Sequence, residues 1–169
     1  MTMKPIMAAT ILLFAAVPAF AQEGDEKAEA PAEMSAAERS AAFLAANAAR
    51  DGVMTTASGL QYEVIAKAVQ NGRQPKKNSI VVVHYVGMLI DGSVFDSSLA
   101  RGAPDTFRVD SVIAGWSEGL QLMSVGDKFR FFIPPALAYG EAGVPSVKIG
   151  PHETLIFDVE LIRVGRSSF

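Results

Sequence analysis

The sequence predicts an α+β domain with five or six antiparallel strands and one short helix, in which one face of the sheet contacts water. Three observations predict it. After the first third of the chain, several short segments alternate apolar and polar residues with a period of two, which is typical of half-buried strands. Asp91-Gly92 follows a long β-branched run and is a strong hairpin signal. Trp116, Leu120 and Met123 have the spacing of one helix face.

Each expected strand has its own signal. Leu60, Tyr62 and Val64 alternate with polar residues, a β-branched run follows, and the chain then returns from the hairpin turn. A later strand ends at Pro134-Pro135, because proline cannot donate a hydrogen bond to the sheet. The expected strands are residues 60–64, 80–90, 93–95, 107–109, 129–133 and 154–164.

The N-terminal third has a different composition. Residues 1–21 carry one charge, an apolar run and small residues before a cleavage site, which together predict a secretory signal peptide. Residues 22–33 are acidic and poor in large apolar groups, which predicts a flexible linker. We therefore expect an acidic linker and short helical segment over residues 22–55, a folded domain over 56–169, and a protein of the periplasm that is not inserted in the membrane.

A short helix is expected over residues 35–49. Ser35 and Glu38 form a capping-box pattern, and Gly52 is placed to end the helix. Phe43 and Leu44 are its only large apolar residues, so the pattern leaves three arrangements open: packing on the following domain, packing on a second copy, or a solvated helix. Because so short a helix is marginal in water, we expect a monomer.

Composition excludes several functions. From residue 41 onward, 12 basic side chains balance 12 acidic ones, so no basic stripe favours nucleic acid as a partner. The chain has no cysteine, and its two histidines, His84 and His152, lack metal-ligand spacing. No glycine-rich phosphate loop is present. We therefore expect no metal and no cofactor, and hydrolysis, redox chemistry and phosphoryl transfer are disfavoured.

Aromatic residues are concentrated in and beside the expected strands and helix. They are either simply the core, as we expect for Phe131, or the lining of a concave apolar site where hydroxyls and an indole find partners. The residues concerned are Tyr85, Phe95, Phe107, Trp116, Phe131, Tyr139 and Phe157.

Four ordered segments resemble the motifs of FKBP-type peptidyl-prolyl cis/trans isomerases. They are VVVHYVGMLIDGSVFDSS (81–98), VIAGWSEGLQLMSVGDK (112–128), PPALAYGEAG (134–143) and TLIFDVEL (154–161). The preceding NAARDGVMTTASGLQYEVI is similar to the lead-in of an exported bacterial branch related to macrophage infectivity potentiators. The resemblance implies a sheet wrapped across one short helix, and an enzyme that isomerises Xaa-Pro bonds.

The resemblance also implies roles for individual residues. Trp116 corresponds to the pocket floor, and the Tyr139 hydroxyl and the Ile113 backbone N–H correspond to groups that bind substrate carbonyls. Asp96 corresponds to the one buried acid of the family, beside Tyr85 and Arg101, where we expect it to orient the Tyr85 hydroxyl rather than transfer a proton. The implied catalytic residues are Tyr85, Asp96 and Tyr139, and the implied substrate-binding residues are Phe95, Phe107, Val112, Ile113, Trp116 and Phe157.

Three positions depart from the family pattern. Asp105 stands where macrolide-binding members have a second phenylalanine, Leu137 replaces a tyrosine, and the loop VPSVKIGPH is one residue longer and carries Lys148. The implied partners are proline-containing unfolded or nascent exported proteins, with macrolide inhibitors as further ligands of the pocket. The alternative function is an exported chaperone or peptide-binding module with vestigial isomerase activity, whereas nothing specific favours storage of an apolar small molecule.

Overall fold

The computed structural model describes residues 34–68 and 72–165. The expected signal peptide (1–21) and the acidic segment 22–33 lie outside these residues. Within the described part of the chain, no helix has the length and apolar character needed to cross a membrane.

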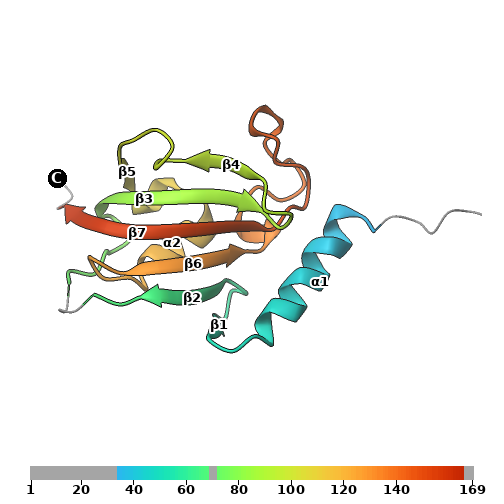
Figure 1. Ribbon diagram of the computed structural model, residues 1–169, viewed down its shortest axis with the longest axis horizontal. Helices are drawn as coiled ribbons and strands as arrows, with labels where there is room; N and C mark the ends of the chain where they lie inside the picture. Colours follow the sequence, from blue (N-terminus) through green and yellow to red (C-terminus); the bar gives the residue numbers. More distant parts are fainter. Residues whose placement is uncertain (1–33, 69–71, 166–169) are drawn as a thin grey trace, which may run out of the picture. The chain divides into compact units, whose positions relative to one another are not determined.

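Seven antiparallel strands form one sheet, in the order β1-β2-β6-β7-β3-β4, and β5 also pairs with β3 (Figure 1). The strands are β1 Val53–Thr55, β2 Gln61–Ala66, β3 Ile80–Leu89, β4 Val94–Ser97, β5 Asp105–Arg108, β6 Lys128–Ile133 and β7 Leu155–Gly165. The α-helices are α1 Ala36–Ala48 and α2 Ala114–Leu120, and short 3-10 turns cover Val109–Ser111, Pro135–Leu137 and Pro145–Val147.

The α+β fold is confirmed, but the sheet has one strand more than the five or six expected. The added strand, β1, pairs with β2 at the sheet edge, Val53 opposite Glu63. It has three residues and no apolar alternation, so the period-two pattern did not reveal it. The strand expected at 107–109 begins two residues earlier, at Asp105, and it ends at Arg108 because Val109 starts a 3-10 turn.

Helix α2 lies across one face of the sheet and belongs to the core (Figure 1). Trp116 and Leu120 are buried, and Met123 just beyond the helix is fully buried. Gly119, which weakens an isolated helix by about 1 kcal/mol relative to Ala, has a packing reason. A Cβ at this position would lie 2.7 Å from the ring of Phe131, so only glycine lets the helix approach β6 this closely. Phe131 is fully buried, as expected of a core residue.

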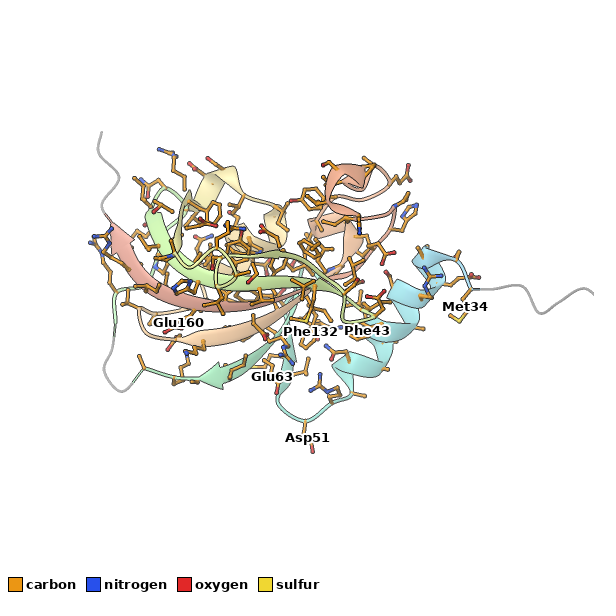
Figure 2. All side chains as sticks on the ribbon, turned by 45° about the horizontal axis from the view of Figure 1, so that its top comes forward. Met34, Phe43, Asp51, Glu63, Phe132 and Glu160 are labelled. Atoms are coloured by element: carbon orange, nitrogen blue, oxygen red, sulfur yellow. The ribbon has the colours of Figure 1, made fainter. Side chains whose placement is uncertain are left out.

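Helix α1 packs on the domain, which excludes the solvated arrangement. Its capping box is confirmed, with Ser35 and Glu38 bonding each other's backbone N–H. The ring of Phe43 lies 6.0 Å from that of Phe132, between centroids, and Figure 2 shows the two side by side. The two residues of α1 that are buried are polar, Ser40 and Asn47, each 2% exposed. The apolar pattern did not indicate these two polar contacts.

Candidate functional site

One cavity of about 640 Å³ opens beside α2, and all nine residues expected at the site line it. The wall comes from β3, β4, β5, β7, from α2 with the residues that lead into it, and from the loop between β6 and β7. Four residues that the sequence did not indicate, Ser111, Val144, Val147 and Ile149, complete it. The expected residues at the cavity are Tyr85, Phe95, Asp96, Phe107, Val112, Ile113, Trp116, Tyr139 and Phe157.

Trp116 lies at the centre of the aromatic wall and is 4% exposed. Its ring meets those of Tyr85, Phe107 and Phe157 edge to face, with centroid distances of 5.2, 5.5 and 5.2 Å. Such arrangements suit the charge distribution of aromatic rings and hold each ring in place. The indole N–H finds no hydrogen-bond partner in the described part of the chain, contrary to the expectation that it would be paired.

A glycine of β3 makes room for two of these rings. A Cβ at Gly87 would lie 2.7 Å from both the Phe95 and the Phe157 rings. Phe95 and Phe157 themselves meet edge to face at 5.5 Å. Gly87 interrupts a run of β-branched and aromatic residues, and an isolated glycine in a strand signals a close approach of another group. That signal was available in the sequence.

A polar network lies at one edge of the cavity. The Tyr85 hydroxyl donates to Asp96 Oδ2 at 2.5 Å, and Arg101 Nη2 donates to the Tyr85 oxygen at 3.0 Å. Arg101 also forms ion pairs with Asp96 and with Asp105. The expected partners of Asp96 are therefore confirmed.

The charges of this network are fixed around neutral pH. Burial, and then the hydrogen bond to the Asp96 carboxylate, raise the pKa of Tyr85 well above its usual value. Partial burial alone raises the pKa of Asp96, but hydrogen bonds from Tyr85 and Arg101 outweigh it and leave the pKa lowered. Tyr85 therefore stays a neutral donor and Asp96 a charged acceptor across the physiological range.

The expectation that Asp96 is buried is wrong, because 37% of its side chain is exposed. Its carboxylate lies at the cavity edge, where water and Arg101 both stabilise the charge. The buried acid is Asp127, whose side chain is 1% exposed. It accepts hydrogen bonds from the backbone N–H groups of Ala68 and Ser124 and from Lys67. Hydrophobic periodicity did not indicate this role.

Two groups at the cavity are free to bind a ligand. Tyr139 is 41% exposed, so its hydroxyl is accessible from the cavity. Ile113 is the N-cap of α2, whose first turn has unpaired N–H groups, as at any helix start. Both residues lie on the cavity wall, so the hydroxyl and the N–H are donors for the carbonyl oxygens of a bound peptide.

The segment 138–153, which we call the pocket loop, supplies Tyr139, Val144, Val147 and Ile149 to the cavity. Val144 and Ile149 pair across it as an isolated bridge. Apolar side chains within a segment rich in glycine and proline indicate a binding surface, because loops otherwise expose polar residues. The segment VPSVKIGPH carries this pattern in the sequence.

The residues that depart from the family pattern can be located in the structure. Asp105 pairs with Arg101 at the cavity edge and Leu137 packs against the hydrophobic core rather than lining the cavity. Lys148 adopts a left-handed backbone conformation, with φ 63°. His84 contacts Ser98 Oγ at 3.0 Å. Within the described residues, no group of three or more His, Asp or Glu side chains is arranged to hold a metal ion.

Comparison with known proteins agrees with this geometry. Residues 71–162 match the model of the FKBP-type peptidyl-prolyl cis-trans isomerases, and residues 3–64 match that of the domain amino terminal to such isomerases. A probable FKBP-type isomerase FkpA of Neisseria meningitidis is 54% identical over 128 residues, which are 76% of this chain and 46% of that protein. The isomerase Mip of Coxiella burnetii is 52% identical over 128 residues, or 76% and 54% of the two chains.

The chain thus spans about half the length of these curated relatives. A crystal structure of a peptidyl-prolyl cis-trans isomerase from Pseudomonas syringae has a TM-score of 0.71 at 39% identity, over 78% of this chain and 94% of that one. The isomerase model covers more than half of the sequence, and the wrapped sheet with its aromatic cavity is the fold expected from it. This chain therefore belongs to the family of FKBP-type peptidyl-prolyl cis-trans isomerases.

Proposed function

We propose that this chain is a peptidyl-prolyl cis/trans isomerase that accelerates Xaa-Pro rotation in exported proteins as they fold. The observation that carries the proposal is the convergence of all nine expected residues on one largely apolar cavity. It favours isomerase activity over a chaperone with a vestigial site, since a vestigial site would have lost part of this set. The Pseudomonas isomerase, nearly all of which this chain matches, also supports it.

The chemistry requires no covalent bond to break. Resonance gives the C–N bond a rotation barrier of about 18–20 kcal/mol, and uncatalysed X-Pro rotation takes tens to hundreds of seconds. The twisted transition state has less charge separation than the planar amide. A cavity that removes water from the amide therefore favours the twisted form, and each 1.4 kcal/mol of preference is tenfold in rate.

The residues of the cavity have different roles in the proposed mechanism. Trp116 and Phe157 exclude water from the proline ring and the amide. The hydroxyl of Tyr139 and the N–H of Ile113 bind the carbonyls that flank it. Asp96 orients the hydroxyl of Tyr85 and keeps Arg101 in place, and it transfers no proton.

A protease-free assay of the mature protein on a proline peptide tests the function. We expect catalysed isomerisation, and Tyr139→Phe should lower kcat/KM about tenfold through the loss of one hydrogen bond. Tyr62→Phe is the matched control, because Tyr62 stacks on Phe129 and does not line the cavity. Catalysis that is absent in the unmodified protein, or lowered equally by both variants, would contradict the proposal.

The location and domain organisation are part of the proposal. Residues 1–21 form a cleaved signal peptide, residues 22–33 an acidic linker, and the folded protein acts as a monomer in the periplasm. Sequencing of protein from the cell envelope should begin at Gln22. A start at Met1 in the cytoplasmic fraction would contradict export, and a dimer that persists on dilution in light scattering would contradict the monomer. Macrolides are further candidate ligands of the pocket, with weak affinity expected because Asp105 replaces a phenylalanine of the macrolide-binding members, and the same assay measures their binding as inhibition.

A further inference from the structure

The pocket loop is closed at its base by backbone contacts. His152 donates its N–H to the carbonyl oxygen of Gly140 at 2.8 Å, which joins the end of the loop to the residue after Tyr139. Val144 and Ile149 pair further along it. The placement of Tyr139 against the cavity therefore depends on where the backbone of His152 is held.

Helix α1 reaches this base through one hydroxyl. Ser40 Oγ donates to the carbonyl oxygen of His152 at 2.7 Å and accepts from the N–H of Thr154 at 2.9 Å. Ser40 is 2% exposed and Thr154 is fully buried, so no water can replace the hydroxyl without a rearrangement. The helix and the base of the loop are thus joined by two short, enclosed hydrogen bonds.

The backbone of His152 needs such support. Its φ is 58°, in the left-handed region that residues other than glycine rarely adopt. A conformation of this kind persists where the surroundings determine it. Two bonds do so here: the N–H of His152 is held by Gly140, and its carbonyl is held by Ser40.

We infer that Ser40 is a positioning residue of the pocket, which from helix α1 fixes the base of the pocket loop and thereby the placement of Tyr139 for peptide binding. The inference rests on the proposed isomerase function for its kinetic consequence. Its structural consequence, a pocket loop held by α1, is independent of that function.

The chain offers a matched control on the same helix. Asn47 is also 2% exposed and also makes two side-chain hydrogen bonds, one to Gln61 Oε1 and one from Arg50, both at 2.7 Å. Its contacts lead to β2 rather than to the pocket loop. Ser40→Ala and Asn47→Ala each remove two bonds of α1, so a merely structural role predicts the same outcome for both.

Steady-state isomerisation of a proline peptide, without protease, separates the two roles. Ser40→Ala should raise KM about three- to tenfold with kcat nearly unchanged, because the loop contributes binding shared by the ground and transition states. Asn47→Ala should leave both constants within about twofold. Equal KM values for the two variants would overturn the inference.

Amide hydrogen exchange provides a readout that does not need activity. In Ser40→Ala, the N–H groups of His152 and Gly143 should exchange about tenfold faster, whereas Asn47→Ala leaves them unchanged. Unchanged exchange in Ser40→Ala would overturn the inference.

If the unmodified protein proves inactive, the proposed function fails separately. Peptide affinity, from the emission of Trp116, then replaces KM, and equal affinity of both variants contradicts the role of Ser40.

Discussion

The two α-helices contact the same strand by opposite chemistry. Helix α2 lies against Phe131 of β6 with apolar side chains and a glycine, whereas α1 reaches Phe132, on the other face of that strand, with one ring. The contacts that α1 buries most deeply are the hydrogen bonds of Ser40 and Asn47. Helix α2 therefore builds part of the core and of the cavity wall, whereas α1 is attached at a few directional points.

Truncating one aromatic residue on each helix should give the largest contrast. Trp116→Ala removes a ring that is 4% exposed and should lower the free energy of unfolding by about 3–5 kcal/mol. Phe43→Ala removes a half-buried ring and should lower it by only about 1–2 kcal/mol. Urea unfolding measures both values. Equal losses would mean that α1 is as much a part of the core as α2.

The second contrast is in how low pH changes the stability cost of removing a buried polar side chain near each helix. Burial alone raises the pKa of Asp127, but the hydrogen bonds from Ala68, Lys67 and Ser124 leave it lowered, so the folded state favours the carboxylate. Its contribution is present above the unfolded value of about 3.9 and is lost as pH falls through the folded pKa. Asp127→Asn should cost about 1–3 kcal/mol at pH 7 and less near pH 2.

Asn47, on α1, is neutral and provides the comparison. The cost of Asn47→Ala should change less between these two pH values, because neither Asn47 nor its buried partner Gln61 titrates. Urea unfolding at both pH values measures the two variants. A loss for Asp127→Asn that does not shrink in acid would contradict the assignment of a charged, hydrogen-bonded carboxylate to the turn that follows α2.

A methyl group added to α2 tests how closely this helix packs on β6. Gly119→Ala gains about 1 kcal/mol of helix propensity but places a Cβ 2.7 Å from the buried ring of Phe131, and overpacking costs about 1–3 kcal/mol. We expect a net loss of about 1 kcal/mol in urea unfolding. Ala46→Gly on the exposed side of α1 should lose a similar amount by propensity alone. Net stabilisation by Gly119→Ala would show that α2 can move away from β6.

Most of the sheet and the cavity wall could be predicted from the sequence, for reasons that particular residues make clear. Apolar alternation predicts strands such as β7, and the motifs around Trp116 and Tyr139 carry the resemblance to the family. The buried polar contacts of α1 could not be predicted. For example, the burial of Ser40 depends on its hydrogen bond with Thr154, which lies 114 residues away. Hydrophobic patterns carry no information on such polar partners.

The polar residues at and near the site show the same limit. Asp96 was expected to be buried, but it lies at the cavity edge and pairs with the half-exposed Arg101. Asp127 can be buried because Lys67 and the backbone N–H groups of Ala68 and Ser124 converge on it. Whether a carboxylate is buried depends on its hydrogen-bond partners in three dimensions, whereas the burial of an apolar strand residue can be predicted from the period-two pattern.

We propose that the pocket catalyses by excluding water and binding carbonyls, with no proton transfer. The most direct test is the pH dependence of kcat/KM on a proline peptide. The pKa of Tyr85 is raised and that of Asp96 is lowered, so neither changes charge between about pH 6 and 8, and neither histidine lines the cavity. We expect kcat/KM to be constant across this range. A bell-shaped profile centred near neutral pH would contradict the account.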